Sequence, residues 1–198
     1  MKLLLVHLFI LYPFVVLGQS ETSNIIMKTE YGSKNKELRE LLRFENIDHY
    51  NVVFSGKELK GRNFSLISKT YLDGVNTNID TIVNSKQTGD PRIASDSLSF
   101  SVTGKKMEGR LKVFFKFQGQ GNERYFEAIQ SDDYSMRDIG VDWKIKVGDP
   151  FPAFAYILPY ERNGQKMYCE VDKHGKDINS WGAKFGIKHY IIFEIKFD

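Results

Sequence analysis

The sequence contains a single cysteine among its 198 residues. A lone thiol cannot form a disulfide within the chain, so packing and hydrogen bonds have to hold the fold together. A chain of this length buries roughly 70% of the surface that its unfolded form exposes, which is enough for a stable core without covalent crosslinks. A disulfide-stapled scaffold is therefore excluded.

The charge balance lacks a strong excess of either sign. Lysine and arginine together number 28, aspartate and glutamate number 25, and no block of five like charges occurs. Neutralising a phosphate backbone requires a dense basic face, which this composition does not provide. We therefore expect no nucleic-acid partner.

Apolar residues form one long run, and it lies at the N-terminus. The stretch MKLLLVHLFILYPFVVLGQS begins with the basic Lys2, continues with a nearly unbroken apolar segment from Leu3 to Leu17, and has small residues at Val16 and Gly18. These features are typical of a secretory signal peptide cleaved after Gly18. The alternative is a membrane anchor, but the run is shorter than the ~18–20 apolar residues that a spanning helix needs.

The domain boundaries and the compartment follow from this segment. We predict a signal peptide at 1–18 and one domain at 19–198, with no membrane span after cleavage and no lipid anchor, because no cysteine follows the apolar run. The mature protein is expected in the periplasm or outside the cell.

Signatures of common catalytic and metal sites are missing. The sequence has no G-x-S-x-G motif and no glycine-rich phosphate loop. Zinc needs three or four converging ligands, but His49, His174 and His189 are far apart in the sequence. We therefore expect no metal and no cofactor.

What the sequence does have is alternation of apolar and polar residues. Such alternation is typical of antiparallel strands with one buried and one solvated face. It is clearest in five segments, YNVVF (50–54), LSFSV (98–102), RLKVFFKF (110–117), DWKIKV (142–147) and YIIFEIKF (190–197). Weaker strands are predicted at 62–72, 77–83, 124–130, 153–160 and 166–172.

Turn residues separate these segments. Asn163-Gly164 and Asp73-Gly74 are typical of tight hairpin turns, because both positions tolerate a positive φ. Pro150 and Pro152 predict a corner in GDPFP, since proline cannot donate to a strand ladder. Together with the 15 phenylalanines, this pattern predicts a mainly β fold, an antiparallel β-sandwich or jelly roll, with a closed barrel as the alternative.

One helix is predicted near the N-terminus of the mature chain. Leu38, Leu41 and Leu42 have helical spacing in KNKELRELLRF, and lysine and glutamate occupy the other faces. We expect a short amphipathic helix at about 34–45 that covers a sheet face or plugs one end of the sandwich.

The segment QKMYCEVDKHGKD, at 165–177, holds the only cysteine. If it is the second arm of a hairpin, Cys169 shares a face with Met167 and Val171, which favours an inert core thiol. A reactive thiol and a metal ligand are the alternatives. The opposite face of the same arm would present Tyr168, Glu170 and Asp172 to solvent.

Trp181 lies among turn residues in NSWGAKFG, and two interpretations stay open. In one, its ring is exposed and stacks on a sugar, so that Trp181, Tyr168, Glu170 and Asp172 form a ligand-binding set. In the other, Trp181 folds back as a core plug. Asp132 and Asp133, with Asp138 nearby, are candidates for the carboxylate pair of a glycoside hydrolase.

The segments FPAFAYILPY and WGAKFGIKHYIIFEIKF, with the signal peptide and the length, resemble small exported proteins of unknown function from Bacteroidetes. The resemblance implies export in a Gram-negative bacterium and carries no functional residues. We predict an exported, non-catalytic domain that binds a glycan or an envelope protein. The alternatives are a carboxylate-dependent hydrolase and a structural subunit that pairs through an exposed edge at Tyr190–Phe197.

Overall fold

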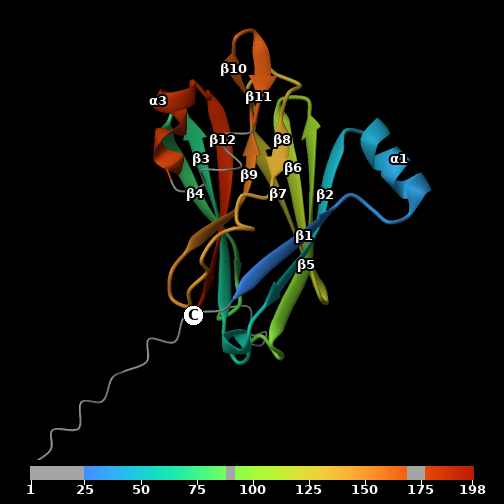
Figure 1. The fold of residues 1–198 in the computed structure, drawn as a ribbon, viewed down its shortest axis with the longest axis vertical. Coiled ribbons are helices and arrows are strands. Elements are labelled where there is room, and N and C mark those ends of the chain that lie inside the picture. The colour runs from blue at the N-terminus through green and yellow to red at the C-terminus, as the bar shows by residue number, and fades with distance from the viewer. Residues whose placement is uncertain (1–24, 88–91, 169–176) are drawn as a thin grey trace, which may run out of the picture.

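The computed structural model describes residues 25–87, 92–168 and 177–198. Within these ranges, two five-stranded antiparallel sheets pack against each other and a two-stranded hairpin extends from one end (Figure 1). The predicted mainly β, sandwich-like fold is confirmed. The predicted signal peptide and Cys169, Glu170 and Asp172 lie outside the described residues.

Both sheets combine strands that are distant in the sequence. The first sheet has the order β1 (Ile26–Tyr31), β2 (Ile47–Ser55), β5 (Ser97–Met107), β6 (Arg110–Phe117) and β7 (Gln120–Glu127). The second has the order β4 (Val75–Asn84), β3 (Phe64–Leu72), β12 (His189–Phe197), β9 (Phe151–Ile157) and β8 (Ser135–Arg137). The hairpin consists of β10 (Tyr160–Arg162) and β11 (Gln165–Met167).

Phenylalanine side chains fill the space between the sheets. The ring of Phe115 on β6 meets the ring of Phe193 on β12 edge to face, with centroids 5.2 Å apart. Phe54 on β2 contacts Phe151 and Phe197 of the opposite sheet in the same manner. All five side chains are buried. Aromatic pairs in this geometry add to the free energy gained from burying their area.

The last strand is central and not an edge. β12 pairs with β3 along its whole length and with β9 from Tyr190 to Ile195. The prediction that Tyr190–Phe197 offers a free edge for a structural partner is therefore wrong. Its run of buried residues is explained by cover on both faces, because Phe193 packs on Phe115 of the other sheet and Tyr190 packs on Trp181.

Side chains from the first sheet cover the edges of the second. Arg124 of β7 forms an ion pair with Asp80 of β4 at 3.0 Å and donates to two carbonyl oxygens of the same strand. At the other edge, the backbone N–H of Met136 on β8 donates to Asp48, and its carbonyl accepts from the Tyr50 hydroxyl. Edge backbone groups that would otherwise invite strand addition are used inside the molecule.

The strand and turn predictions had different outcomes. Asn163 and Gly164 form the β10–β11 turn with φ values of 54° and 74°, as predicted. The segment 142–147 is not a strand, and it contributes only an isolated bridge between Ile145 and Ile25. Pro152 lies inside β9 and not at a corner before it. A register irregularity in the pairing with β12 accommodates the proline there.

Two helices lie at the same end of the sandwich (Figure 1). α1 (Lys36–Phe44) occupies the connection between β1 and β2, and no residue of it is buried. It projects beyond the first sheet, so the expectation that it covers a sheet face or plugs an end is wrong. α3 (Trp181–Phe185) precedes β12 and buries its first residue completely. Two single-turn helices, η1 (Lys57–Leu59) and η2 (Ile178–Ser180), complete the elements in the described ranges.

Candidate functional site

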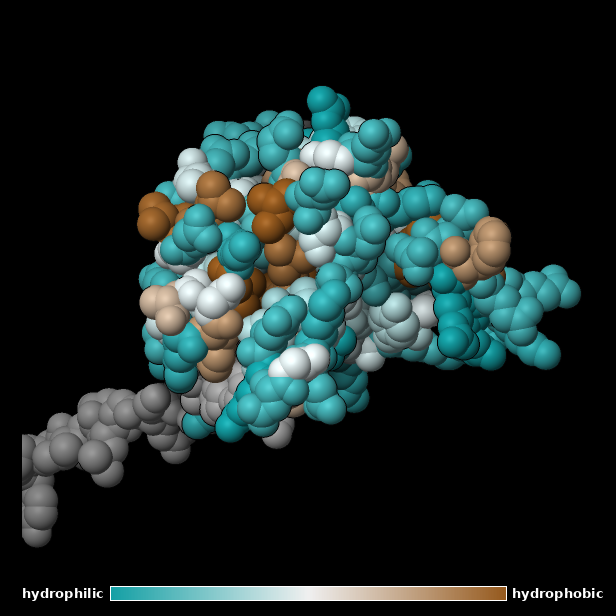
Figure 2. Space-filling model, turned by 90° about the horizontal axis from the view of Figure 1, so that it is seen from above, coloured by the Kyte–Doolittle hydropathy of each residue, from teal (hydrophilic) through white to brown (hydrophobic). Residues whose placement is uncertain are grey.

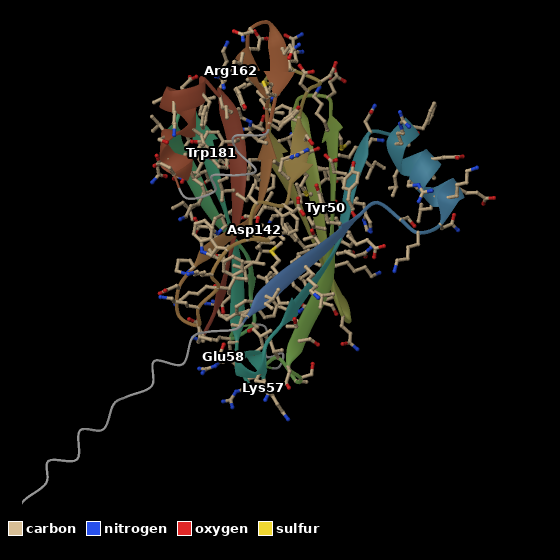
Figure 3. All side chains as sticks on the ribbon, in the orientation of Figure 1. Tyr50, Lys57, Glu58, Asp142, Arg162 and Trp181 are labelled. Atoms are coloured by element: carbon tan, nitrogen blue, oxygen red, sulfur yellow. The ribbon has the colours of Figure 1, made fainter. Side chains whose placement is uncertain are left out.

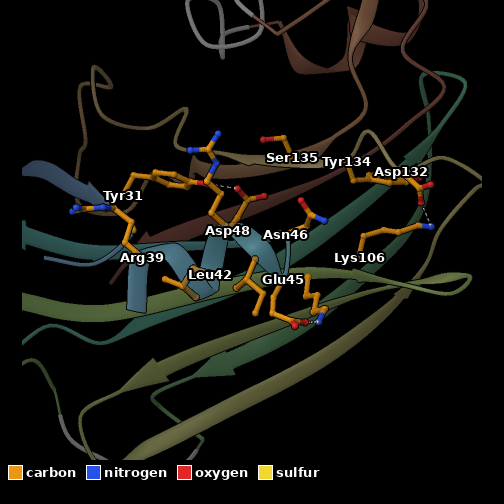
Figure 4. Close-up of a pocket in the computed structure, with 14 residues that line it drawn as sticks. Tyr31, Arg39, Leu42, Glu45, Asn46, Asp48, Lys106, Asp132, Tyr134 and Ser135 are labelled. Carbon is orange, nitrogen blue, oxygen red and sulfur yellow. Dashed lines mark hydrogen bonds and ion pairs between the residues drawn. The ribbon is translucent and has the colours of Figure 1, made fainter. Parts of the chain in front are cut away.

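A cleft of about 870 Å³ lies between α1 and the adjoining end of the sandwich (Figure 4). Its walls come from the end of β1, from α1, from the start of β2, from the end of β5 and from the segment that leads into β8. The first three stretches follow one another in the sequence, and the sheet order brings the end of β5 and the segment before β8 next to them. The cleft combines an exposed aromatic ring with amide, carboxylate and basic side chains.

The first turn of α1 is stabilised by a cap, and both end turns carry charges that suit a helix. The Asn35 side chain accepts a hydrogen bond from the Leu38 N–H at 3.1 Å and so satisfies one of the free donors of the first turn. Glu37 lies in the first turn and Arg43 in the last, which suits the helix dipole. The helix therefore forms for local reasons, although Leu38, Leu41 and Phe44 remain exposed, and Figure 2 shows apolar surface among hydrophilic side chains on the projecting part of the molecule at the right.

Tyr31 and Asp48 define one end of the cleft. The Tyr31 hydroxyl donates to Asp48 at 2.9 Å, and the Met136 N–H donates to the other carboxylate oxygen at 2.8 Å. Burial raises the pKa of Asp48 above its ordinary value, although both hydrogen bonds act in the opposite direction. Burial, followed by the Asp48 charge, raises the pKa of Tyr31 to about 12. The phenol therefore stays protonated and bonded over the physiological range.

The Tyr31 ring is held in place but is still accessible. It meets the ring of Tyr50 edge to face, with centroids 5.0 Å apart. Even so, 62% of Tyr31 is exposed. A ring fixed by one hydrogen bond and one aromatic contact loses little conformational freedom when a ligand packs on it.

The basic residues of the cleft fall into two groups. Lys105 forms an ion pair with Glu45 at 2.7 Å, and Lys106 forms one with Asp132 at 2.8 Å, as Figure 4 shows. The other two basic residues that line the cleft, Arg39 and Arg43, come from α1. Figure 4 shows the Tyr31 and Arg39 side chains at one end of the cleft, with Lys106 and Asp132 at the other.

Trp181 does not form a ligand platform. Its side chain is 0% exposed and packs on the ring of Tyr190, with centroids 5.5 Å apart. Figure 3 shows it at the start of α3, on the opposite side of the view from α1. The interpretation of Trp181 as a core plug is the one that the structure supports, and its assignment to an exposed sugar-binding set is corrected.

The other members of the predicted ligand-binding set are Tyr168, Glu170 and Asp172. Glu170 and Asp172 lie outside the described residues. Tyr168 is half-buried, its hydroxyl donates to the Asp133 carbonyl, and the Arg137 guanidinium lies over its ring at 5.4 Å from the centroid. The structure therefore does not bring Tyr168 and Trp181 together in one site.

The carboxylates proposed for a hydrolase are separated. Asp132 lines the α1 cleft and pairs with Lys106, whereas Asp133 lines a different hollow and pairs with Lys166 at 2.6 Å. The hydrogen bond from Lys166 is the main cause of the lowered pKa of Asp133. A general acid needs the opposite shift. Asp138 accepts a hydrogen bond from Thr29 at the edge of the first sheet.

Within residues 25–87, 92–168 and 177–198, no three histidine, cysteine or acidic side chains converge as metal ligands. The helices in the same ranges are too short and too polar to span a bilayer.

Comparison with known proteins gave no relative: no family model, no curated protein and no solved structure matches the chain. The resemblance to exported Bacteroidetes proteins stays a prediction, and so do export and ligand binding.

Sequence reasoning singled out Asp132 and the helix but missed Tyr31 and Asp48, which define one end of the α1 cleft. Tyr31 is the last residue of the short strand β1, and Asp48 lies two residues before the first strongly alternating segment. The signal that could have found them is the charged helix between them. A helix that connects two neighbouring antiparallel strands has to lie beyond the strand ends, beside the residues that flank it.

Proposed function

We propose that the chain is an exported, non-catalytic domain that binds a glycan in the cleft beside α1. The observation that carries the proposal is the Tyr31 ring, which is 62% exposed and is fixed by Asp48 and Tyr50. Sugar rings pack their C–H faces on exposed aromatic rings, and their hydroxyls exchange hydrogen bonds with side chains at the rim.

The polar lining of the cleft suits such a ligand. Asn46 and Ser135 line the same cleft and offer amide and hydroxyl groups. The Lys105–Glu45 and Lys106–Asp132 ion pairs place further donors and acceptors at its rim. A cleft of about 870 Å³ that is open to solvent accommodates a short oligosaccharide.

The proposal assigns recognition and not hydrolysis to this cleft. Asp132 is neutralised by Lys106, and the carboxylate of Asp48 accepts two hydrogen bonds, from Tyr31 and Met136. Carboxylates held in this way fix the walls of a site. Export rests on the N-terminal segment 1–18, and its test is the mass of the mature chain, which is expected to begin at Gln19.

The binding test compares two exposed tyrosines. The wild type and the variants Tyr31→Ala and Tyr125→Ala are assayed on a broad glycan array and then by affinity electrophoresis in the best polysaccharide. Tyr125 is 48% exposed on the opposite edge strand of the first sheet, β7, and is the matched control. We expect Tyr31→Ala to weaken binding at least tenfold in a protein that is still folded, with a slightly lower melting temperature because Asp48 and Tyr50 each lose a contact, and Tyr125→Ala to bind like the wild type.

Other results would overturn the proposal. If the wild type binds no glycan, or if both tyrosine variants bind equally well, the cleft is not a glycan site. Release of new reducing ends during incubation with a bound polysaccharide would show that the domain is a hydrolase. Retention of an envelope protein through Tyr31, with no glycan bound, would assign the cleft to a protein ligand.

A further inference from the structure

We propose that the glycan bound beside α1 is acidic, and that Arg39 and Arg43 recognise its carboxylate or sulfate group. This inference rests on the proposed function of the cleft and adds the class of ligand. It follows from the charges that line the cleft and from how each of them is satisfied.

The two arginines lie on one face of α1. Arg39 and Arg43 are four residues apart, so their side chains emerge one turn apart on the same side of α1, and both line the cleft. Like charges at this spacing destabilise a helix, since they repel each other. An anion between the two guanidinium groups would remove that repulsion.

Neither arginine has a carboxylate partner among the described residues. Arg39 donates one hydrogen bond, to the Ser33 carbonyl at 3.2 Å, and no ion pair or hydrogen bond of the Arg43 side chain occurs within the described ranges. Arginine presents five N–H donors, so most of these are available to a ligand.

The acidic residues of the same cleft already have hydrogen-bond or ion-pair partners. Glu45 pairs with Lys105 and Asp132 pairs with Lys106. Asp48 accepts from Tyr31 and Met136, and its pKa is raised by burial. The lining of the cleft therefore carries four basic side chains against three carboxylates, and its two arginines are the basic groups without an ion-pair partner among the described residues, next to an aromatic ring.

This combination matches an acidic sugar better than a neutral one. A guanidinium group binds a planar carboxylate or a sulfate through two parallel hydrogen bonds, which the point charge of a lysine does not reproduce. Tyr31 would receive the sugar ring while the arginines hold its acidic substituent. A uronic acid and a sulfated sugar share this chemistry, and the experiment distinguishes them.

The experiment measures affinity by isothermal titration calorimetry with three probes: tetragalacturonic acid, its fully methyl-esterified form, and a sulfated neutral tetrasaccharide. Each probe is titrated into the mature wild type and into the variants Arg39→Gln/Arg43→Gln, Arg39→Lys/Arg43→Lys and Lys36→Gln. Lys36 is the matched control, because it is on the same helix, pairs with Glu40 and does not line the cleft.

We expect the wild type to bind at least one acidic probe ten times or more tightly than the methyl ester. The double glutamine variant should lose that preference, the double lysine variant should keep only part of it, and Lys36→Gln should change affinity less than twofold. All melting temperatures should stay within a degree, because α1 buries no residue.

The contrary results separate the two proposals. Equal affinity for the acidic probes and the methyl ester, unaffected by the arginine substitutions, would overturn this inference and leave glycan binding intact. An equal loss in Lys36→Gln would mean general attraction to a basic surface and would also overturn it. Failure of the wild type to bind any glycan would overturn the proposed function itself.

Discussion

The two helices at one end of the sandwich differ in how many of their residues are buried. α1 has nine residues, three of them leucines, and buries none of them. α3 has only five residues and places Trp181 completely inside the core. The longer and more regularly amphipathic helix is thus the one that contributes least to the core.

The connections explain this difference. α1 joins β1 to β2, whose ends pair directly at Tyr31 and Tyr50, so the helix starts and finishes beyond the same end of one sheet. α3 leads into the central strand β12, and its Gly182 lies against the backbone of Gly74 in the β3–β4 turn. Amphipathic spacing shows which side of a helix is apolar, but the connection decides whether that side reaches the core.

The largest expected effect is at Trp181. Truncating this buried ring to alanine should lower the free energy of unfolding by about 3–5 kcal/mol. Phe44→Ala removes a ring that is 81% exposed on α1, and it should change stability by no more than about 0.5 kcal/mol. Urea denaturation at pH 7 measures both. Similar costs at the two sites would show that the contrast between the helices is wrong.

A second effect is expected where α3 meets the β3–β4 turn. A Cβ added at Gly182 would lie 2.4 Å from the Gly74 Cα, which the backbone can relieve only by moving. We expect Gly182→Ala to destabilise the protein by about 1–3 kcal/mol, as overpacking does. Alanine normally stabilises a helix relative to glycine, so a raised melting temperature would rule out this close approach.

The pH dependence should also come from the α3 side. His189, at the start of β12, is buried, its Nδ1 lies 2.7 Å from the Tyr134 hydroxyl, and burial lowers its pKa below 6.5. As the pH falls below about 6.5, the unfolded chain takes up a proton before the folded one does, so stability is lost. His189→Gln should flatten the stability curve between pH 7 and 5 more than His49→Gln does, because burial lowers the pKa of both histidines and His189 is the more deeply buried. A wild-type curve that is already flat there would contradict this assignment.

The sequence predicted the sandwich because alternation of apolar and polar residues shows which face of a strand is buried. Val113 and Phe115 of β6 point inward as the pattern indicates, since a strand with one wet face has only one way to orient. The same pattern failed at 142–147. There Ile145 is buried, but its backbone pairs with Ile25 in an isolated bridge and not in a ladder, and apolar neighbours at a spacing of two do not reveal the difference.

The candidate site could not be predicted in the same way. The turn residues around Trp181 left both an exposed and a buried ring open, and they do not reveal that its neighbour Gly182 packs on the distant turn at Gly74. The cleft depends on β8, a strand of three residues, reaching Asp48 across the gap between the sheets. No local sequence pattern reveals a contact between residues that are 88 positions apart.

The smallest effect on global stability is expected at the cap of α1. Asn35→Ala removes the hydrogen bond to the Leu38 N–H, a loss of about 0.5–2 kcal/mol for the helix itself. Because α1 buries no residue, it can unfold locally while the sandwich stays intact, so the global unfolding free energy should change by less than about 0.5 kcal/mol. Hydrogen exchange should quicken at the amides of α1 and stay unchanged in β12. Faster exchange in both elements would mean that α1 and the core unfold as one unit, and the contrast between the two helices would then concern packing but not cooperativity.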